Sequence, residues 1–487
     1  MSEEVAEALA GARQGVKDWI EAHAAEFLPY AERIWRLAEL GGQEFESSKL
    51  LAGLLRERGF TVEEGVAEMP TAFVARWGQG GSVVAFSVEY DALPGLSQQG
   101  MAAHNPVLEG APGHGCGHNL LGVGGVLAAV AAKEWLAQSG RPGQVVVFGT
   151  PGEEICMGKP FMARAGLFEG LDAVLDWHPW TYNLAAPEMC ISYFSLKYHF
   201  KGRTAHGNAP WHGRSALDAA MLAGQAIEYL REHIPPGDPQ AAHTINYTFS
   251  NTGPEIPNVV PDRASLWVIG RLRDAELASQ VLERLHRCAQ GAALATETEV
   301  STEFISATHE KLANQTLAEV VHRNFQWVGA PPFSPEEQEQ ARSMQRQAGA
   351  PEVGLRHDLL PFAPTYTPLS DNSEYSWFAP FAMLMVAIAP EGFGWHNWQV
   401  AACAEQGPGH KGLLTAAQVM AASAVELYLD PDLVARAKAE QVQQVAGRVY
   451  QPLFPPETRP PLELNRATMD KYRDRLAACF PGQGQAQ

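Results

Sequence analysis

The stretch "QVVVFGTPGEE", residues 144–154, passes from an apolar strand into a glycine-containing loop that ends in two adjacent glutamates. Three other stretches follow the same plan: "SVVAFSVEY" (82–90), "DAVLDW" (172–177) and "FAMLMVAIA" (381–389). Each is short and apolar at successive positions, which is typical of strands buried on both faces. Because such strands alternate with helical segments, the sequence predicts an α/β fold with a sheet covered by helices.

The pattern changes between residues 191 and 308, where apolar and polar positions alternate as in half-buried strands. The predicted order is strand, helix, strand, strand, helix, strand, over residues 190–202, 215–234, 243–251, 264–273, 274–293 and 298–305. This order is that of a split βαβ unit, a ferredoxin-like α+β arrangement. We therefore predict that residues 191–308 form a domain inserted into a first, discontinuous domain made of residues 1–190 and 309–487.

The remaining segments carry weaker signals. Residues 15–60 have the periodicity of two amphipathic helices broken at Gly41 and Gly42. Residues 331–365 are rich in Pro, Glu and Gln and predict an exposed excursion with a short helix. Residues 451–464, with several prolines, predict a tail that follows the surface.

The charge balance excludes some classes of partner. The 487-residue chain has 36 basic and 55 acidic residues and a formal net charge of −19. Nucleic acid and anionic membrane surfaces attract basic proteins, so we expect neither as the main partner.

The compartment follows from what the sequence lacks. The N-terminal "MSEEVAEALAGARQG" has neither a basic start nor an apolar core, so we expect no signal peptide. We also expect no transmembrane helix, because no uninterrupted apolar run reaches about 18 residues. The six cysteines are scattered, which favours reduced thiols and a cytoplasmic protein.

The segment "HGCGHNLLG" (114–122) places Cys116 and His118 beside glycines. The glycines could serve only a tight turn before a helix capped by Asn119. A closed structural zinc site would need a second ligand pair, and a redox dithiol would need a second nearby cysteine; the sequence offers neither. A metal site built with residues from elsewhere in the chain remains open.

The other strand ends supply such residues. Glu153 and Glu154 follow one predicted strand, His178 follows another, and His396 follows a third. Alone, a Glu-Glu pair is usually solvated and a single histidine is usually structural. Because carboxyl ends of parallel strands meet at one edge of a sheet, we expect these side chains to meet the Cys116 segment there.

Cys116, His118, Glu154, His178 and His396 then make five protein ligands. Five ligands on one metal ion would leave little room for a substrate, whereas two ions bridged by the thiolate or by a water would each keep an open position. Glu153 would remain free to take a proton from the attacking water and to pass it to a leaving amine.

The motifs that carry these residues resemble a known family, the dinuclear metallo-amidohydrolases that include aminoacylases, carboxypeptidase G and plant auxin-conjugate hydrolases; within it, the aminobenzoyl-glutamate hydrolase subgroup is the most similar. The matching stretches are "EYDALPGLSQQ" (89–99), "GHGCGHNLLG" (113–122), "GTPGEE" (149–154), "WHP" (177–179), "FKGRTAHGNAPWHGRSALDA" (200–219), "PNVVPDRA" (257–264), "WHNWQ" (395–399) and "GHKGLL" (409–414). The resemblance implies a zinc-peptidase-like catalytic domain with a mixed sheet, and an inserted lid and dimerisation domain.

The resemblance also implies roles for individual residues. The five ligands and the general base Glu153 match the family's positions, and Asp91 matches an acidic residue that lies behind the ligands. Asn119 stands where many relatives have Asp, which removes a negative charge from behind the site. The implied cofactors are two divalent ions, Mn²⁺ or Zn²⁺, between which this ligand set does not choose.

In the lid, the resemblance implies that His206 reaches the active site of a neighbouring subunit and stabilises the oxyanion. Asn258 and Arg271 match positions that hold the substrate, and a guanidinium suits a substrate carboxylate. The expected assembly is a homodimer formed through the lid, with a second kind of subunit as a further partner. His410 is not included among the ligands.

The predicted function is hydrolysis of the amide bond of an N-acyl amino acid, such as p-aminobenzoyl-glutamate, or of a small dipeptide. Two alternatives remain open: a related metal-dependent aminohydrolase or deaminase, and a metal-binding homologue without catalysis. Intact Glu153 and a complete ligand set argue against the second alternative.

Overall fold

The computed structural model describes residues 3–405 and 407–480, and it contains a central mixed sheet of seven strands. The strand order is β1 (Thr61–Glu64), β2 (Phe73–Gln79), β4 (Gly143–Gly149), β3 (Val83–Val88), β5 (Ala173–Trp180), β15 (Phe381–Ala387) and β6 (Leu184–Ala185). The four central strands β4, β3, β5 and β15 run parallel, and β1, β2 and β6 are antiparallel to their neighbours. These four parallel strands are the ones that the sequence predicts, so the α/β fold class is confirmed.

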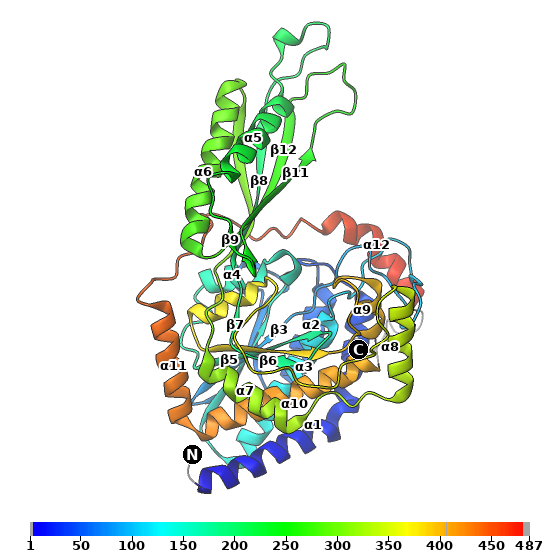
Figure 1. Cartoon of the computed structure of the whole chain (residues 1–487), viewed down its shortest axis with the longest axis vertical. Helices are drawn as coiled ribbons and strands as arrows, with labels where there is room; N and C mark the ends of the chain where they lie inside the picture. Colours follow the sequence, from blue (N-terminus) through cyan, green and yellow to red (C-terminus); the bar gives the residue numbers. More distant parts are fainter. Residues whose placement is uncertain (1–2, 406, 481–487) are drawn as a thin grey trace.

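Helices cover both faces of this sheet (Figure 1). The first face carries α1 (Glu3–Leu37), α3 (His118–Ser139), α7 (Gln315–Val328) and α10 (Pro408–Leu429), and the second carries α4 (Gly158–Arg164) and the 3₁₀ segment Asp371–Trp377. Strand β4 shows why: Val145 and Val147 join the apolar cluster of the first face, whereas Val146 and Phe148 join that of the second. Successive side chains of a strand point to opposite faces, so a strand apolar throughout requires two covers.

Two helices, His118–Ser139 and Pro408–Leu429, are long and apolar enough to cross a membrane by length and composition. In this fold 78% and 94% of their apolar windows are buried, and the two helices pack against each other and against the sheet. Their hydrophobicity is accounted for by the protein core.

A second, antiparallel sheet stands apart from the body (Figure 1). Its order is β11 (Thr244–Asn251), β12 (Arg263–Leu272), β8 (Ser192–Lys201) and β13 (Glu299–Thr308), and it is covered by α5 (Ala216–Arg231) and α6 (Ala275–Ala295). Ser215 and Asp274 cap the two helices by accepting bonds from backbone N–H groups three residues on. The predicted split βαβ unit is confirmed; the predicted domain bounds of 1–190, 191–308 and 309–487 stay a prediction. We call the projecting unit the lid.

The outlying segments were partly predicted. Helix α2 (Phe45–Glu57) follows α1 after the break at Gly41–Gly42, and α8 (Pro335–Gln347) is the short helix expected within residues 331–365. Ser334 and Glu337 cap α8 reciprocally, each side chain binding the other's backbone N–H. The sequence interpretation assigned no helix to α9 (Trp398–Cys403), α11 (Pro431–Val445) or α12 (Arg466–Cys479).

Candidate metal centre and substrate cleft

The two glutamates of the opening stretch sit on a tight turn just after β4. Gly152 (φ 66°) and Cys156 (φ 52°) bracket the turn, and both have left-handed backbone conformations. Buried carboxylates hold the turn from behind: the Gly152 N–H donates to Glu44 Oε1 at 2.8 Å, and the Glu154 N–H donates to Asp91 Oδ2 at 3.0 Å. The turn therefore fixes the direction of both glutamate side chains.

The Cys116 segment is another sharp turn, at the start of α3. Gly117 has φ 84°, and a Cβ there would lie 3.0 Å from Pro179, so glycine is required on both counts. His118 begins the helix, and its Nδ1 donates to Asp91 Oδ1 at 2.9 Å. This bond leaves Nε2 of His118 directed into the cluster, and Asp91 links the histidine to the glutamate turn, as expected of a residue behind the ligands.

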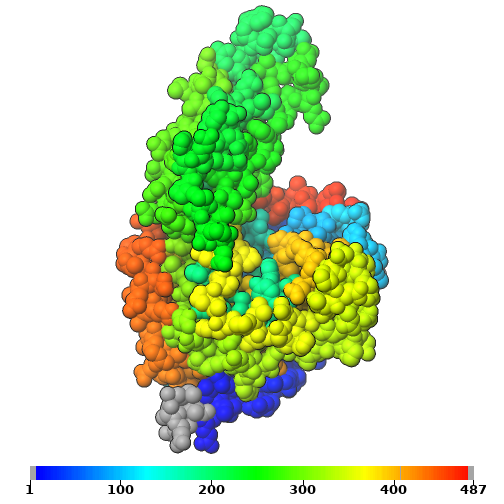
Figure 2. All heavy atoms as spheres, in the orientation of Figure 1, coloured from blue at the N-terminus to red at the C-terminus, as the bar shows by residue number. Residues whose placement is uncertain are grey.

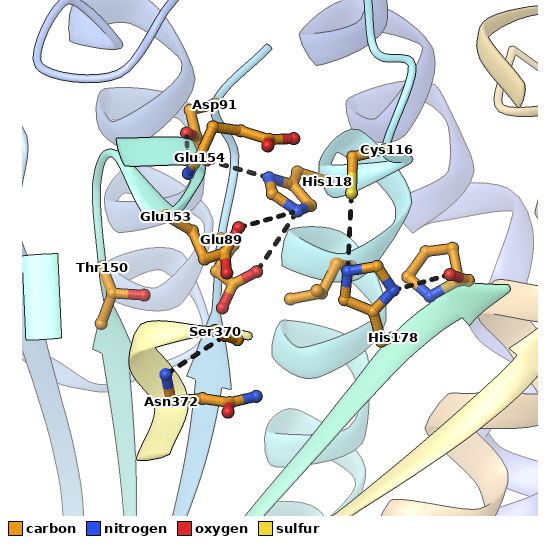
Figure 3. A network of polar contacts seen from close by, with 12 residues as sticks. Glu89, Asp91, Cys116, His118, Thr150, Glu153, Glu154, His178, Ser370 and Asn372 are labelled. Atoms are coloured by element: carbon orange, nitrogen blue, oxygen red, sulfur yellow. Dashed lines mark hydrogen bonds and ion pairs between the residues drawn. The ribbon is translucent and has the colours of Figure 1, made fainter. Parts of the chain in front are cut away.

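All five predicted ligands come together at the carboxyl edge of the sheet (Figure 3 shows four of them). Cys116 Sγ lies 3.5 Å from His178 Nε2, and His396 Nε2 lies 3.4 Å from Glu154 Oε2. Two groups of donor atoms can each hold an ion: Cys116 with His118 and His178, and Cys116 with Glu154 and His396. Cys116 belongs to both groups, so its sulfur lies where it could bridge two ions.

His178 is placed differently from the sequence interpretation. It lies within β5, which continues to Trp180 because Trp180 pairs in parallel with Ala387 of β15. His178 Nδ1 donates to the Pro179 carbonyl at 2.6 Å, so Nε2 is the nitrogen that faces Cys116.

The chemistry of the cluster fits metal ions. Within the described chain, His118 Nε2 and Glu154 Oε1 are buried without a hydrogen-bond partner. Buried polar atoms left unpaired cost about 1–3 kcal/mol each, a penalty that a bound cation removes. Burial lowers the pKa of His178 to about 4, and partial burial lowers that of His396 to about 4. Both imidazoles are therefore neutral at pH 7, the form that binds metals.

Glu153 points into the same space, with its Oε2 3.8 Å from His118 Nε2. Burial and the neighbouring Glu89 charge raise the pKa of Glu153 well above its ordinary value. A carboxylate that holds a proton more tightly is a better proton acceptor when it is ionised. The arrangement therefore suits Glu153 to proton transfer.

Sequence reasoning missed Glu89, although it opens one of the quoted motifs. Glu89 is buried, and its Oε2 lies 3.5 Å from His118 Nε2. Its other oxygen accepts a bond from the buried Lys159 Nζ at 2.8 Å, and Lys159 also pairs with Asp371. A signal was present: Glu89 and Asp91 are two positions apart at a strand end, a spacing that puts two side chains on one side.

A cleft of about 430 Å³ opens beside the cluster. Besides Cys116, Glu153, Glu154, His178 and His396, its wall includes Trp180, Tyr193, Arg271, Leu369, Met383, Met385 and Trp395. The Trp180 and Trp395 rings lie 4.5 Å apart, and Trp395 Nε1 donates to Cys116 Sγ at 3.2 Å. Tyr193 and Arg271 come from the lid, so the cleft lies where the lid meets the body; the molecular surface is hollowed beneath the lid (Figure 2).

Residues 85–351 match the peptidase family M20/M25/M40. The chain belongs to this family. It is a hydrolase of amide or peptide bonds. It is 35% identical over 475 residues to the p-aminobenzoyl-glutamate hydrolase of Escherichia coli (strain K12), in the component of that enzyme designated B, covering 91% of this chain and 98% of that protein. It is 32% identical over 329 residues to the Xaa-Arg dipeptidase of Mus musculus, covering 63% of this chain and 69% of that protein.

Solved structures share the fold of this M20 hydrolase. An aminobenzoyl-glutamate utilization protein from Klebsiella pneumoniae superimposes with a TM-score of 0.54 at 18% identity, covering 83% of this chain and 98% of that one. A dinuclear metal-binding M20 peptidase from Bacillus subtilis gives 0.52 at 17% identity, with 84% and 99% covered. At these identities the likeness establishes the architecture of body and lid.

Arg271 and the other predicted lid residues lie at opposite ends of the lid. Arg271 pairs with Tyr193 at the base of the lid sheet, in the cleft wall. His206 and Asn258 lie beyond the far end, on exposed loops, with His206 Nε2 3.5 Å from Asn258 Nδ2. Strand β8 alone separates the two ends by roughly 30 Å at about 3.3 Å per residue, so His206 does not reach the cleft of its own chain.

Asn119 makes contacts other than those expected of a residue behind the ligands. Its side-chain amide donates to the backbone carbonyls of Ala31 and Ala404, at 3.2 and 2.8 Å. The side chain ties the start of α3 to α1 and to the segment after α9. An amide can donate to two carbonyls, which a carboxylate cannot do, so Asn at this position fits its surroundings.

Proposed function

We propose that this M20 hydrolase is a metal-dependent amidohydrolase that cleaves the amide bond of an N-acyl amino acid, of the p-aminobenzoyl-glutamate kind, or of a small dipeptide. The observation that carries the proposal is a cleft with three features side by side. It has the five-ligand cluster, the carboxylate of Glu153, and an aromatic wall that ends at Arg271.

The cluster supports two divalent cations, Mn²⁺ or Zn²⁺, held by Cys116, His118 and His178 and by Cys116, Glu154 and His396. When bound, such a pair of ions polarises a carbonyl and lowers the pKa of water. Burial and the charge of Glu154 raise the pKa of the Cys116 thiol, so the protein alone does not favour a thiolate. We therefore expect metal uptake to release protons.

Glu153 supplies the proton transfers. Its carboxylate, in the cleft wall, takes a proton from the attacking water and passes it to the nitrogen of the leaving amine. The tetrahedral oxyanion needs a donor, and we propose that His206 of a second protomer provides it. The exposed place of His206, far from its own cleft, is compatible with a role in a neighbouring protomer.

Substrate recognition follows from the wall of the cleft. The Trp180 and Trp395 rings offer flat apolar surfaces for an aromatic acyl group, and Met383 and Met385 add adaptable apolar contacts. Arg271 offers a two-pronged partner for the free carboxylate of the amino acid. Asn258, next to His206 at the lid tip, would contact substrate only from the same neighbouring protomer.

We also propose a homodimer formed through the lid, in the cytoplasm. The lid exposes large apolar side chains: Trp211 is 68% exposed, Met221 57% and Tyr229 63%. Such residues are typical of an interface. The E. coli relative is named as one of the lettered components of its enzyme, which supports a second kind of subunit as a further partner.

The test is product identification. The metal-free protein is reloaded with Mn²⁺ or Zn²⁺ and incubated with p-aminobenzoyl-glutamate, other N-acyl amino acids and dipeptides, and the products are identified by mass spectrometry. Release of a free amino acid with its acyl acid supports the proposal. Release of ammonia alone would indicate a deaminase instead, and a fully loaded protein without turnover would indicate a metal-binding homologue.

A further inference from the structure

Glu89 has one oxygen that the protein leaves unused. The side chain is 1% exposed, at the end of β3, and its Oε1 accepts a bond from Lys159 Nζ at 2.8 Å. Its Oε2 is buried and has no hydrogen-bond partner among the described residues. Because a buried unpaired carboxylate oxygen is costly, its environment implies a ligand.

This oxygen faces another buried atom without a partner. Glu89 Oε2 lies 3.5 Å from His118 Nε2, which likewise has no hydrogen-bond partner in the described part of the chain. His118 already uses Nδ1 to donate to Asp91, so Nε2 is the nitrogen available to a cation. A cation bound to both atoms would satisfy both.

Lys159 does not account for the charge of Glu89. The lysine is fully buried and has a second counter-ion, Asp371, whose other oxygen accepts the Lys159 backbone N–H at 3.1 Å. Two carboxylates therefore share one ammonium, which leaves one negative charge in excess. Lys159 holds one oxygen of Glu89 in place and leaves the other directed at His118.

Two candidate ion groups share His118: one with Cys116 and His178, and one with Glu89 and Glu153. Since His118 has only Nε2 to offer, both groups describe one cation position. Glu153 lines the cleft and is in reach of substrate, whereas Glu89 does not line it. Of the two glutamates, Glu89 is therefore the one placed to serve as a permanent ligand.

We propose that Glu89 is a sixth protein ligand, which binds through Oε2 the cation held by Cys116, His118 and His178. The proposal rests on the metal pair of the proposed function. It gives that position an additional hard oxygen donor and a negative charge, which favour Mn²⁺ relative to a site of thiolate and imidazoles alone.

The test compares metal binding by the full-length protein and two variants. Metal-free wild type, Glu89→Gln and Glu89→Asp are titrated with Mn²⁺ by calorimetry, and the Co²⁺-loaded forms are compared by visible absorption. Gln keeps the shape and an acceptor for Lys159 but removes the charge; Asp keeps the charge but draws the oxygen back. We expect both variants to bind one of two Mn²⁺ ions at least about tenfold more weakly. We expect the Co²⁺ bands to intensify as the coordination number falls.

Glu188→Gln is the matched control. Glu188 is also buried and pairs with a buried lysine, Lys311, at 3.3 Å, but it belongs to none of the candidate ion groups in the described chain. It should lose stability as Glu89→Gln does and keep wild-type metal affinity. This comparison separates a ligand from a carboxylate that only balances a lysine.

Two Mn²⁺ ions bound by Glu89→Gln and Glu89→Asp within about twofold of wild-type affinity, with unchanged Co²⁺ bands, would overturn the proposal. A variant that does not fold leaves the decision to the other, and failure of both to fold while Glu188→Gln folds would count against Glu89 as a replaceable ligand. A wild type that binds both ions but cleaves no amide would defeat the proposed function and leave Glu89 assigned. A wild type that binds no metal ion would defeat both.

Discussion

Glu153 and Glu154 are neighbours in the chain, yet they have different surroundings. Glu154 lies against His396, whereas Glu153 lies in the cleft wall near His118 without a hydrogen bond to it. A 3₁₀ turn held by Asp91 and Glu44 separates the two side chains. At the residue scale, the site depends on this difference in direction.

For Glu153→Ala we expect a folded protein that binds both metal ions and loses turnover by at least about 10²–10⁴-fold, because the proton acceptor is gone. Metal content and kcat on the best substrate are the measurements. Glu169→Ala, at an exposed position of the body, serves as a control and should keep full activity. Turnover near the wild-type level in Glu153→Ala would remove Glu153 from the mechanism.

The sequence predicts the clustering of the ligands because each lies at or near the carboxyl end of a strand apolar on both faces. It did not reveal Glu89, because a single Glu before Tyr-Asp carries no sign of the lysine that holds it. Lys159 and Asp371 are 212 positions apart, and only the fold brings them to one another. Asn119 was misjudged for the same reason: its partners, Ala31 and Ala404, are distant in the chain.

At the scale of elements, α3 has a left-handed glycine at each end, and the two allow a matched comparison. Gly117 precedes the helix at φ 84° and Gly140 follows it at φ 64°. A Cβ on Gly117 would lie 3.0 Å from Pro179, whereas a Cβ on Gly140 would meet nothing within 4 Å in the described residues.

We expect Gly117→Ala and Gly140→Ala each to lower the free energy of unfolding by about 1–2 kcal/mol, because both force alanine into a left-handed conformation. Only Gly117→Ala should also weaken metal binding, because Gly117 lies between Cys116 and His118. Denaturant unfolding and Mn²⁺ titration measure the two effects. Equal metal affinity in the two variants would show that the backbone at Gly117 does not set the ligand geometry.

Among the elements, the central strands are predictable because they are apolar at every position, and the edges are not. Strand β2 is buried over Phe73, Val74 and Ala75 and then exposed, so its sequence lacks a sustained period. Helices α11 and α12 bury only a few side chains each and offer little periodic signal. The turn around Gly152 and Cys156 could not be foreseen, because nothing in "PGEEIC" requires a left-handed cysteine.

At the scale of the whole molecule, Arg271 joins the lid to the cleft. For Arg271→Leu we expect KM for acyl amino acids to rise about 10- to 100-fold with a smaller change in kcat, because a charged hydrogen-bonding partner of the carboxylate is lost. Arg273→Leu, two residues on, removes an exposed arginine paired with Asp274 and should leave KM unchanged. The effect should vanish for substrates whose carboxylate is amidated, and an equal rise for those substrates would refute the carboxylate contact.

The proposed role of His206 in a partner protomer can be tested by mixing two inactive proteins. Glu153→Ala lacks the base, and His206→Ala lacks the oxyanion donor. If His206 acts across the dimer, refolding an equal mixture should restore about one quarter of wild-type activity, since half of the dimers are mixed and each has one intact site. No gain above the separate variants would contradict action in trans, and light scattering on the same mixture checks that dimers form.

The sequence predicts the insertion of the lid from a change in periodicity, but it does not fix what the lid tips contact. His206 and Asn258 lie next to each other in the chain fold without reaching the cleft, so their partners depend on a second molecule. The base of the lid is different: Tyr193 and Arg271 could be placed near the cleft once the register of β8 and β12 was known.

The lid enters and leaves the body through adjacent ends of β8 and β13, where Tyr193 pairs with Thr308. A narrow two-strand attachment of this kind makes the lid a lever with its fulcrum beside the cleft. A swing of about 10° would carry the tips through roughly 5 Å, given a strand length of roughly 30 Å, while Arg271, close to the fulcrum, would shift by only a fraction of that. Large excursions at the outer end can therefore occur while the carboxylate clamp keeps its aim.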